Sequence, residues 1–151
     1  MVDVRKVSII SADASQLIQE LSEELKTITG SSGSNGFQLN VMENQRAAFF
    51  VAYLNGEAVG CGAIVEYTRN IAEIKRVYSR KRAIGIGRAI IIALEQEAQK
   101  LGYQSIILET RKVNRTAVNF YLNNRYQICG NYGKYIGRDE AICFIKNIQH
   151  I

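Results

Sequence analysis

Hydrophobic residues change their spacing several times along the chain, and each change predicts a new structural element. Residues 4–10 predict a short edge strand, with Val4, Lys6 and Ser8 on one face and Arg5, Val7 and Ile9 on the other. The apolar residues that follow recur at helical spacing and predict a first helix (Leu17, Ile18, Leu21, Leu25 and Ile28). We expect Asp13 to be its N-cap, with Gln16 completing a capping box, and Gly30 to end it.

The middle of the chain predicts an antiparallel meander. Residues 47–54 and 58–66 are rich in aromatic and branched apolar side chains, which is typical of strands. Asn55-Gly56 lies between them and is the strongest short-range signal for a hairpin turn. Residues 71–78 would add a third strand.

The second half predicts a long helix, a strand, a short helix and two final strands (residues 86–101, 105–108, 114–123, 126–130 and 141–148). This order predicts an α/β (α+β) fold. We expect a mixed, largely antiparallel central sheet of about six to seven strands, flanked by helices and containing one right-handed β-α-β crossover.

Length and composition predict a single domain. The chain has 151 residues, of which 47% are hydrophobic, enough for a substantial core. Residues 30–36 are rich in Gly and Ser and predict a mobile flap over a site, because residues 1–30 are too few for a first domain. The longest apolar run, residues 47–54, is far shorter than the about 20 residues of a membrane-spanning helix. With no signal-peptide pattern at the N-terminus, we expect a cytoplasmic protein without a membrane partner.

The cysteines predict neither a metal site nor a disulfide framework. Cys61, Cys129 and Cys143 are far apart in sequence, each in an apolar context typical of a small buried side chain. There is no CxxC pair, and His150 is the only histidine. This usage fits the reducing cytosol.

The net charge of +5 is concentrated in two segments. Residues 69–88 contain seven basic side chains against one acid, Glu73, and residues 110–138 contain six and no acid. A basic run is often a solvated face. Two such runs around one glycine-rich turn favour an anionic ligand instead.

That turn lies at the start of the long helix, where Gly85 and Gly87 stand between Arg82 and Arg88. Glycine lets the backbone approach a phosphate closely, and a helix start offers unpaired N–H groups and the positive end of the dipole. A dinucleotide-binding fold is disfavoured, because Ile90 occupies the third glycine position and the turn follows a meander. A P-loop is excluded, because no GK[ST] follows.

Residues 82–87, RAIGIG, resemble the R/Q-x-x-G-x-G/A motif of the GNAT superfamily of N-acetyltransferases. The resemblance extends to further segments (VGCGA at 59–63, AEIKRVY at 72–78, and LET at 108–110 followed by Asn114, Ala117 and Tyr121). It implies a small stand-alone enzyme of bacterial type, an acyltransferase with one acetyltransferase domain over residues 1–151. Residues 1–46 would be a variable substrate-side segment and residues 47–146 an acetyl-CoA-binding core.

The resemblance also implies acetyl-CoA as co-substrate, a small-molecule or peptide primary amine as acceptor, and no metal. Backbone N–H groups at the helix start would hold the pyrophosphate, while the third strand would pair with the pantetheine arm. An N–H near Val77 or Tyr78 would face the thioester oxygen. The expected binding residues are Val77, Tyr78, Ser79, Arg82, Ala83, Ile84, Gly85, Ile86, Gly87, Arg88, Asn114, Ala117 and Tyr121.

Glu73 and Tyr121 are the candidate catalytic residues. A lysine-like amine has a pKa near 10.4, so a base assists its attack, and Glu73 resembles the acid that some family members use. Strand alternation predicts that Glu73, Lys75 and Val77 share one face. An ion pair with Lys75 is the alternative role for Glu73, and Glu109 or a water is the rival base. Tyr121 would protonate the leaving thiolate, or else serve only as a core tyrosine.

Two other classes of function compete with an enzyme. One is a non-catalytic sensor that binds acyl-CoA. The other is a nucleic-acid-binding module, for which the only sequence evidence is the pair of aromatic residues Tyr132 and Tyr135 beside Lys134. We therefore expect no nucleic-acid partner. Residues 30–46 and 131–139 contain no motif that identifies the amine acceptor. A homodimer is an expectation from the family only.

Overall fold

The computed structural model describes residues 1–33, 39–80 and 85–149. They form a seven-stranded sheet in the order β1-β2-β3-β4-β5-β7-β6. The strands are β1 (Val2–Val7), β2 (Ala48–Leu54), β3 (Glu57–Thr68), β4 (Ile71–Ser79), β5 (Ser105–Arg111), β6 (Gln127–Cys129) and β7 (Ala141–Asn147). The helices are α1 (Ala12–Thr29), α2 (Ile86–Lys100) and α3 (Arg115–Asn123), with short 3-10 helices η2 (Leu39–Glu43) and η4 (Gly133–Tyr135).

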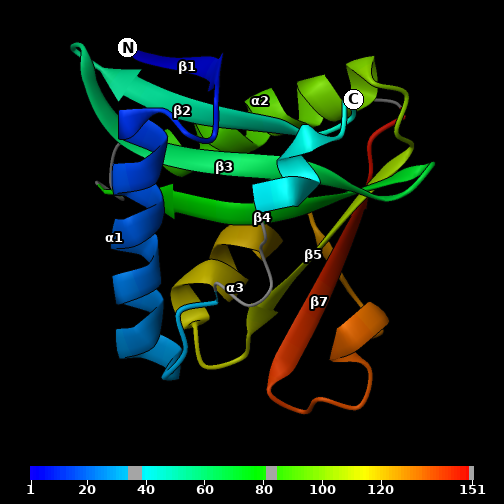
Figure 1. The fold of residues 1–151 in the computed structure, drawn as a ribbon. Helices are drawn as coiled ribbons and strands as arrows, with labels where there is room; N and C mark the ends of the chain where they lie inside the picture. The colour runs from blue at the N-terminus through cyan, green and yellow to red at the C-terminus, as the bar shows by residue number, and fades with distance from the viewer. Residues whose placement is uncertain (34–38, 81–84, 150–151) are drawn as a thin grey trace.

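Neighbouring strands run antiparallel except β4 and β5, which are parallel and are connected through α2. Figure 1 shows α1 and α2 on opposite faces of the β2–β4 part of the sheet, in agreement with two separate apolar clusters. The predicted mixed, largely antiparallel fold with one β-α-β crossover is confirmed.

The β2–β3 hairpin has the turn that its sequence predicts. Asn55 has φ 53° and Gly56 has φ 82°, the left-handed pair that a type I′ turn requires. The expected position of the edge strand is wrong by a few residues, since β1 ends at Val7 and the backbone N–H of Ser11 donates to the Ser8 carbonyl. This local turn ends the strand before α1.

The N-cap of α1 differs from the prediction. Ser11 is the N-cap, and its side chain accepts from the backbone N–H of Ala14. Asp13 lies inside the first turn, where its carboxylate accepts from the Tyr53 hydroxyl at 2.7 Å and faces the positive end of the helix. The C-terminal prediction is confirmed, because Gly30 has φ 82° and its N–H donates to the Lys26 carbonyl.

Two glycines in β3 allow α2 to pack closely on the sheet. A Cβ on Gly60 would lie 2.8 Å from Ile86 Cγ2, and one on Gly62 would lie 2.8 Å from Ile90 Cγ2. Ile86 and Ile90 are fully buried in the larger core. The close contact is therefore made by glycine on the strand and a bulky residue on the helix.

The three cysteines are free thiols. Cys61 and Cys143 are buried, as predicted, and Cys129 is half-buried. Burial raises the pKa of the Cys61 thiol to about 12.

Candidate active site

The site lies where β4 and β5 separate. Their parallel pairing covers Ile71–Glu73 against Ser105–Ile107, and the described residues show no further pair between them. Beyond this point β4 follows β3, and β5 follows β7. A cavity of about 540 Å³ lies there, lined by both strands, by α1, by α3 and by the start of α2. The diverging strands leave one edge of β4 open to a ligand.

A bulge at Arg76 shapes that open edge. Arg76 has φ 57°, and the register with β3 shifts so that Ala63 pairs with Lys75 but Cys61 pairs with Tyr78. The extra residue reverses the alternation of side chains beyond it. Val77 therefore packs in the cluster on the α2 side, whereas Tyr78 packs with the cluster on the α1 side. The prediction that Val77 shares a face with Glu73 and Lys75 is wrong for this reason.

The Arg76 side chain ties the bulge to α1. Its guanidinium donates to Ser22 Oγ at 2.5 Å, to the Ile18 carbonyl at 3.4 Å and to the Ser32 carbonyl at 3.2 Å. The residue is 8% exposed, and burial lowers the pKa of its guanidinium. The sequence gives no signal for this role, because Arg76 reads there as one of several basic residues.

The end of β4 is held by a second network. Arg80 donates to both carboxylate oxygens of Glu20 at 2.7 Å and to the Ala58 carbonyl at 2.6 Å, and the Tyr78 hydroxyl donates to Glu20 at 3.1 Å. The Arg80 hydrogen bonds lower the pKa of Glu20 to about 2. Residues Val77, Tyr78 and Ser79 thus line the cavity from a strand fixed to α1.

The start of α2 has the features of an anion site. Gly85 is the N-cap with φ 76° and no side-chain capping bond, and the first helical bond runs from the Ala89 N–H to the Gly85 carbonyl. The N–H groups of the intervening first turn therefore have no partner within the helix. Gly85, Gly87 and exposed Arg88 line the cavity, whereas the Ile86 side chain is buried in the core. Arg82, Ala83 and Ile84 lie outside the described residues.

Helix α3 forms another wall. Asn114 caps it, since its Oδ1 accepts from the Ala117 N–H at 3.3 Å. Asn114, Ala117 and Tyr121, which are expected to bind acetyl-CoA, all line the cavity. The Phe120 ring approaches the start of α2, because a Cβ on Gly87 would lie 2.9 Å from Phe120 Cε1. Tyr121 is 7% exposed, and burial raises the pKa of its phenol, which keeps the hydroxyl protonated as a donor.

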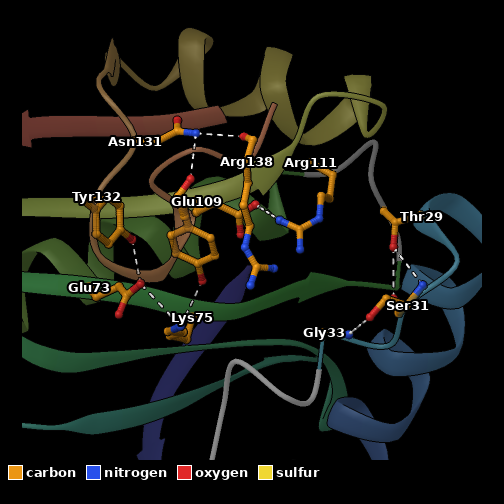
Figure 2. Close-up of polar contacts among 11 residues, drawn as sticks. Thr29, Ser31, Gly33, Glu73, Lys75, Glu109, Arg111, Asn131, Tyr132 and Arg138 are labelled. Carbon is orange, nitrogen blue, oxygen red and sulfur yellow. Dashed lines mark hydrogen bonds and ion pairs between the residues drawn. The ribbon is translucent and has the colours of Figure 1, made fainter. Parts of the chain in front are cut away.

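Two carboxylates lie in the cavity wall. Glu73 Oε2 accepts from the Tyr132 hydroxyl at 2.6 Å and lies 3.4 Å from Lys75 Nζ, as Figure 2 shows. Glu109 is paired with Arg111, and burial raises its pKa despite that charge. Glu73 is therefore both a member of the cavity and an ion-pair partner of Lys75.

A family model for the Acetyltransferase (GNAT) family matches residues 14–124. The chain belongs to this family. It is 30% identical over 134 residues, 87% of each chain, to an IAA acetyltransferase of Azospirillum brasilense. It is therefore a GNAT acyltransferase, with acetyltransferases among its relatives.

Solved structures share the GNAT fold. A Klebsiella pneumoniae crystal structure has a TM-score of 0.82 and 24% identity, covering 98% of both chains. PaiA N-acetyltransferase from Thermoplasma acidophilum, in complex with coenzyme A, has a TM-score of 0.73 at 18% identity over 97% of this chain and 99% of that one. A GNAT acetyltransferase of Elizabethkingia anophelis, with acetyl-CoA bound, has a TM-score of 0.71 at 13% identity over 97% of each.

The GNAT fold brings most of the predicted site residues to one cavity and adds others that the sequence did not indicate. The additions are Arg76, Tyr132 and Tyr135, of which Tyr135 lines the cavity beside Lys75. From the sequence, Tyr132 and Tyr135 are candidates only for the nucleic-acid-binding alternative. No described helix combines the length and hydropathy needed to span a bilayer. Within the described ranges, no three His, Cys, Asp or Glu side chains are grouped for a metal.

Proposed function

We propose that this GNAT protein is an N-acetyltransferase that moves the acetyl group of acetyl-CoA to a primary amine. The observation that carries the proposal is the open edge of β4. It runs from the unpaired N–H groups at the start of α2 to Glu73 and lies beside Tyr121 in one cavity. Two solved relatives of the same fold hold coenzyme A or acetyl-CoA.

The residues present fit acetyl-CoA. A Cβ at Gly85 would meet no atom within 4 Å, so the space above this N-cap is open to a phosphate. Arg88 adds positive charge there, as Arg82 is expected to do. The edge of β4 at residues 77–79, where β5 no longer pairs with it, matches the two amides of pantetheine, which would lie along β4 as an added strand.

The chemistry is a direct attack through a tetrahedral intermediate. Glu73 or Glu109 takes the amine proton, directly or through water. The raised pKa of Glu109 brings its basicity closer to neutral pH, whereas the Oε2 atom of Glu73 already accepts from Tyr132. A backbone N–H near Val77 or Tyr78 stabilises the oxyanion, and the Tyr121 hydroxyl donates to the leaving sulfur.

Residues 1–46, the expected substrate-side segment, contribute to the cavity wall. Leu21, Glu24, Leu25 and Gly33 of this segment line the cavity. We propose that residues 1–46 shape the acceptor pocket of a cytoplasmic, single-domain enzyme and that residues 47–146 bind acetyl-CoA.

Replacing Gly85 tests the phosphate site. Gly85→Ala should weaken coenzyme A binding at least about tenfold, because the new Cβ occupies the phosphate approach at a left-handed position. Titration calorimetry with coenzyme A measures the loss, and thiol release from acetyl-CoA with a panel of amines separates an enzyme from a sensor.

Gly102→Ala is the matched control. Gly102 has φ 90° and equally open surroundings, but it lies at the other end of α2. Both variants carry the same backbone strain of about 1–2 kcal/mol, so only the Gly85 variant should lose affinity. Equal affinity in the two variants would refute the phosphate site.

A further inference from the structure

Basic side chains collect at the cavity around Glu73 and Glu109. We define the rim cluster as Lys75, Arg111, Lys134 and Arg138. Lys75 Nζ donates to the Tyr135 hydroxyl at 3.5 Å, and Lys134 Nζ lies 5.5 Å from the centre of the same ring. Besides burial, the positive charge of Arg138 helps to lower the pKa of Lys134. Arg111 forms an ion pair with Glu109. Figure 2 shows Arg111 joined to Glu109 and Lys75 joined to Glu73, with the Arg138 side chain directed toward the same region.

The four cations of the rim cluster differ in whether an acid pairs with them. Glu73 pairs with Lys75 and Glu109 with Arg111. Within the part of the chain that the structure describes, neither Lys134 nor Arg138 forms an ion pair with an acid. Burial and the nearby Lys75 lower the pKa of Lys134, and together they outweigh the opposing effect of Glu73 and Glu109.

Lys134 and Arg138 lie in residues 131–138, which form a turn held by hydrogen bonds. Asn131 Nδ2 donates to the Tyr135 carbonyl at 3.0 Å and to the Arg138 carbonyl at 3.0 Å, as Figure 2 shows. The Arg138 N–H donates back to the Tyr135 carbonyl at 3.0 Å. These bonds hold Lys134 and Arg138 in one turn with Tyr135, whose side chain lines the cavity.

We propose that the acceptor is a small amine that carries a carboxylate, of which a free amino acid is the simplest example. Its amine would face Glu73 and Glu109, and its carboxylate would reach Lys134 and Arg138. Arginine binds carboxylates through paired hydrogen bonds, which makes Arg138 the main anchor. A polyamine or aminoglycoside has no carboxylate for these two cations to bind.

This inference rests on the proposed acetyl transfer and names the substrate of the same site. The reaction forms one N–C bond and breaks the C–S bond of the thioester. The nitrogen loses one proton to a wall carboxylate, and the sulfur gains one from Tyr121. The cavity of about 540 Å³ must also admit the pantetheine arm, which restricts the acceptor to a small molecule.

The test compares leucine, leucinamide, 3-methylbutylamine and spermidine, with release of coenzyme A as the readout. Rates are corrected for the fraction of neutral amine, because the compounds differ in amine pKa. Leucine should have a kcat/KM at least about tenfold above leucinamide, and spermidine should be the poorest substrate. A leucinamide or spermidine rate equal to or above that of leucine would overturn the inference while leaving acetyl transfer intact.

Two rim variants make the test specific to named residues. Lys134→Met and Arg138→Gln should each raise KM for leucine about tenfold, so that the leucine-to-leucinamide preference falls towards one. Lys100→Met is the control, because Lys100 is exposed at the end of α2, lies outside the cluster and carries the same charge. An unchanged preference in both rim variants would overturn the proposed carboxylate site. No release of coenzyme A with any amine would overturn the acetyl transfer itself, and this inference with it.

Discussion

At the scale of single residues, the site depends on side chains whose surroundings fix their protonation. Tyr121 is buried among the rings of Phe120, Tyr126 and Phe144, and burial raises the pKa of its phenol. The phenol therefore remains a hydrogen-bond donor at every working pH. Burial also raises the pKa of Glu109, which makes this carboxylate a stronger base than an exposed glutamate.

Tyr121→Phe tests the donor. The variant should lower kcat by about 10²–10⁴-fold and leave coenzyme A affinity nearly unchanged, because it removes only the hydroxyl that we propose as the proton donor to the leaving sulfur. Steady-state kinetics and calorimetry measure the two effects.

Tyr53→Phe is the control for Tyr121→Phe. It removes a hydroxyl that is bonded to Asp13 and does not line the cavity. If Tyr121→Phe turned over as fast as the Tyr53 control, Tyr121 would be a core residue only.

At the scale of elements, the cavity depends on how closely α2 approaches β3. Gly62 has no room for a side chain, since a Cβ there would lie 2.8 Å from Ile90 Cγ2 and 3.0 Å from Leu94 Cδ1. This contact sets the position of the α2 start, and with it the position of the proposed phosphate site. The glycines of β3 and those of the turn thus serve the same site for different physical reasons.

Gly62→Ala should lower the free energy of unfolding by about 1–3 kcal/mol, because the methyl group overpacks the contact with α2. Urea denaturation followed by circular dichroism measures the change. Gly130→Ala is the control, since a Cβ there meets no atom within 4 Å and φ is not positive. The control should stay within about 0.5 kcal/mol of the parent protein, and an equal loss in both variants would contradict close packing.

At the scale of the whole molecule, α1 is tied to the central strand by polar bonds that span the sequence. Glu20 bonds Arg80, and Ser22 bonds Arg76, across 60 and 54 residues. These bonds connect the substrate-side segment to the strand that would carry acetyl-CoA. A shift of α1 can therefore be transmitted to β4 through these hydrogen bonds.

The Glu20 pKa makes that connection dependent on pH. Its folded-state value of about 2 lies below the ordinary 4.5, so its contribution to stability is complete above about pH 4.5 and is lost as the pH falls towards 2. Glu20→Gln should therefore be less stable than the parent at pH 7, and the difference should shrink below pH 4.5. Thermal unfolding across this range measures it.

Glu23→Gln is the control for Glu20→Gln, because Glu23 is exposed on the same helix. A stability difference for Glu20→Gln that stayed constant from pH 7 to pH 3 would contradict the role given to the Arg80 bonds.

Several features were predictable because each depends on a short stretch of sequence. The Asn55-Gly56 turn and α2 follow from local backbone preferences and from the spacing of apolar residues. The glycine motif and the residues that resemble GNAT indicated the cavity wall from Asn114 to Tyr121 in the same way. The N-cap of α1 was predicted wrongly, because Ser11 and Asp13 are both good caps and the contact with distant Tyr53 separates them.

The sequence by itself determined the order of the elements, the hairpin and the glycine-rich helix start. Only the tertiary structure decided the bulge at Arg76, the Tyr132 bond to Glu73 and the gathering of Lys134 and Arg138 at the cavity. The physical reason is the sequence separation of the residues that make each contact. Periodicity reports the average surroundings of one segment, whereas strand register, burial and charge balance depend on which distant segments meet.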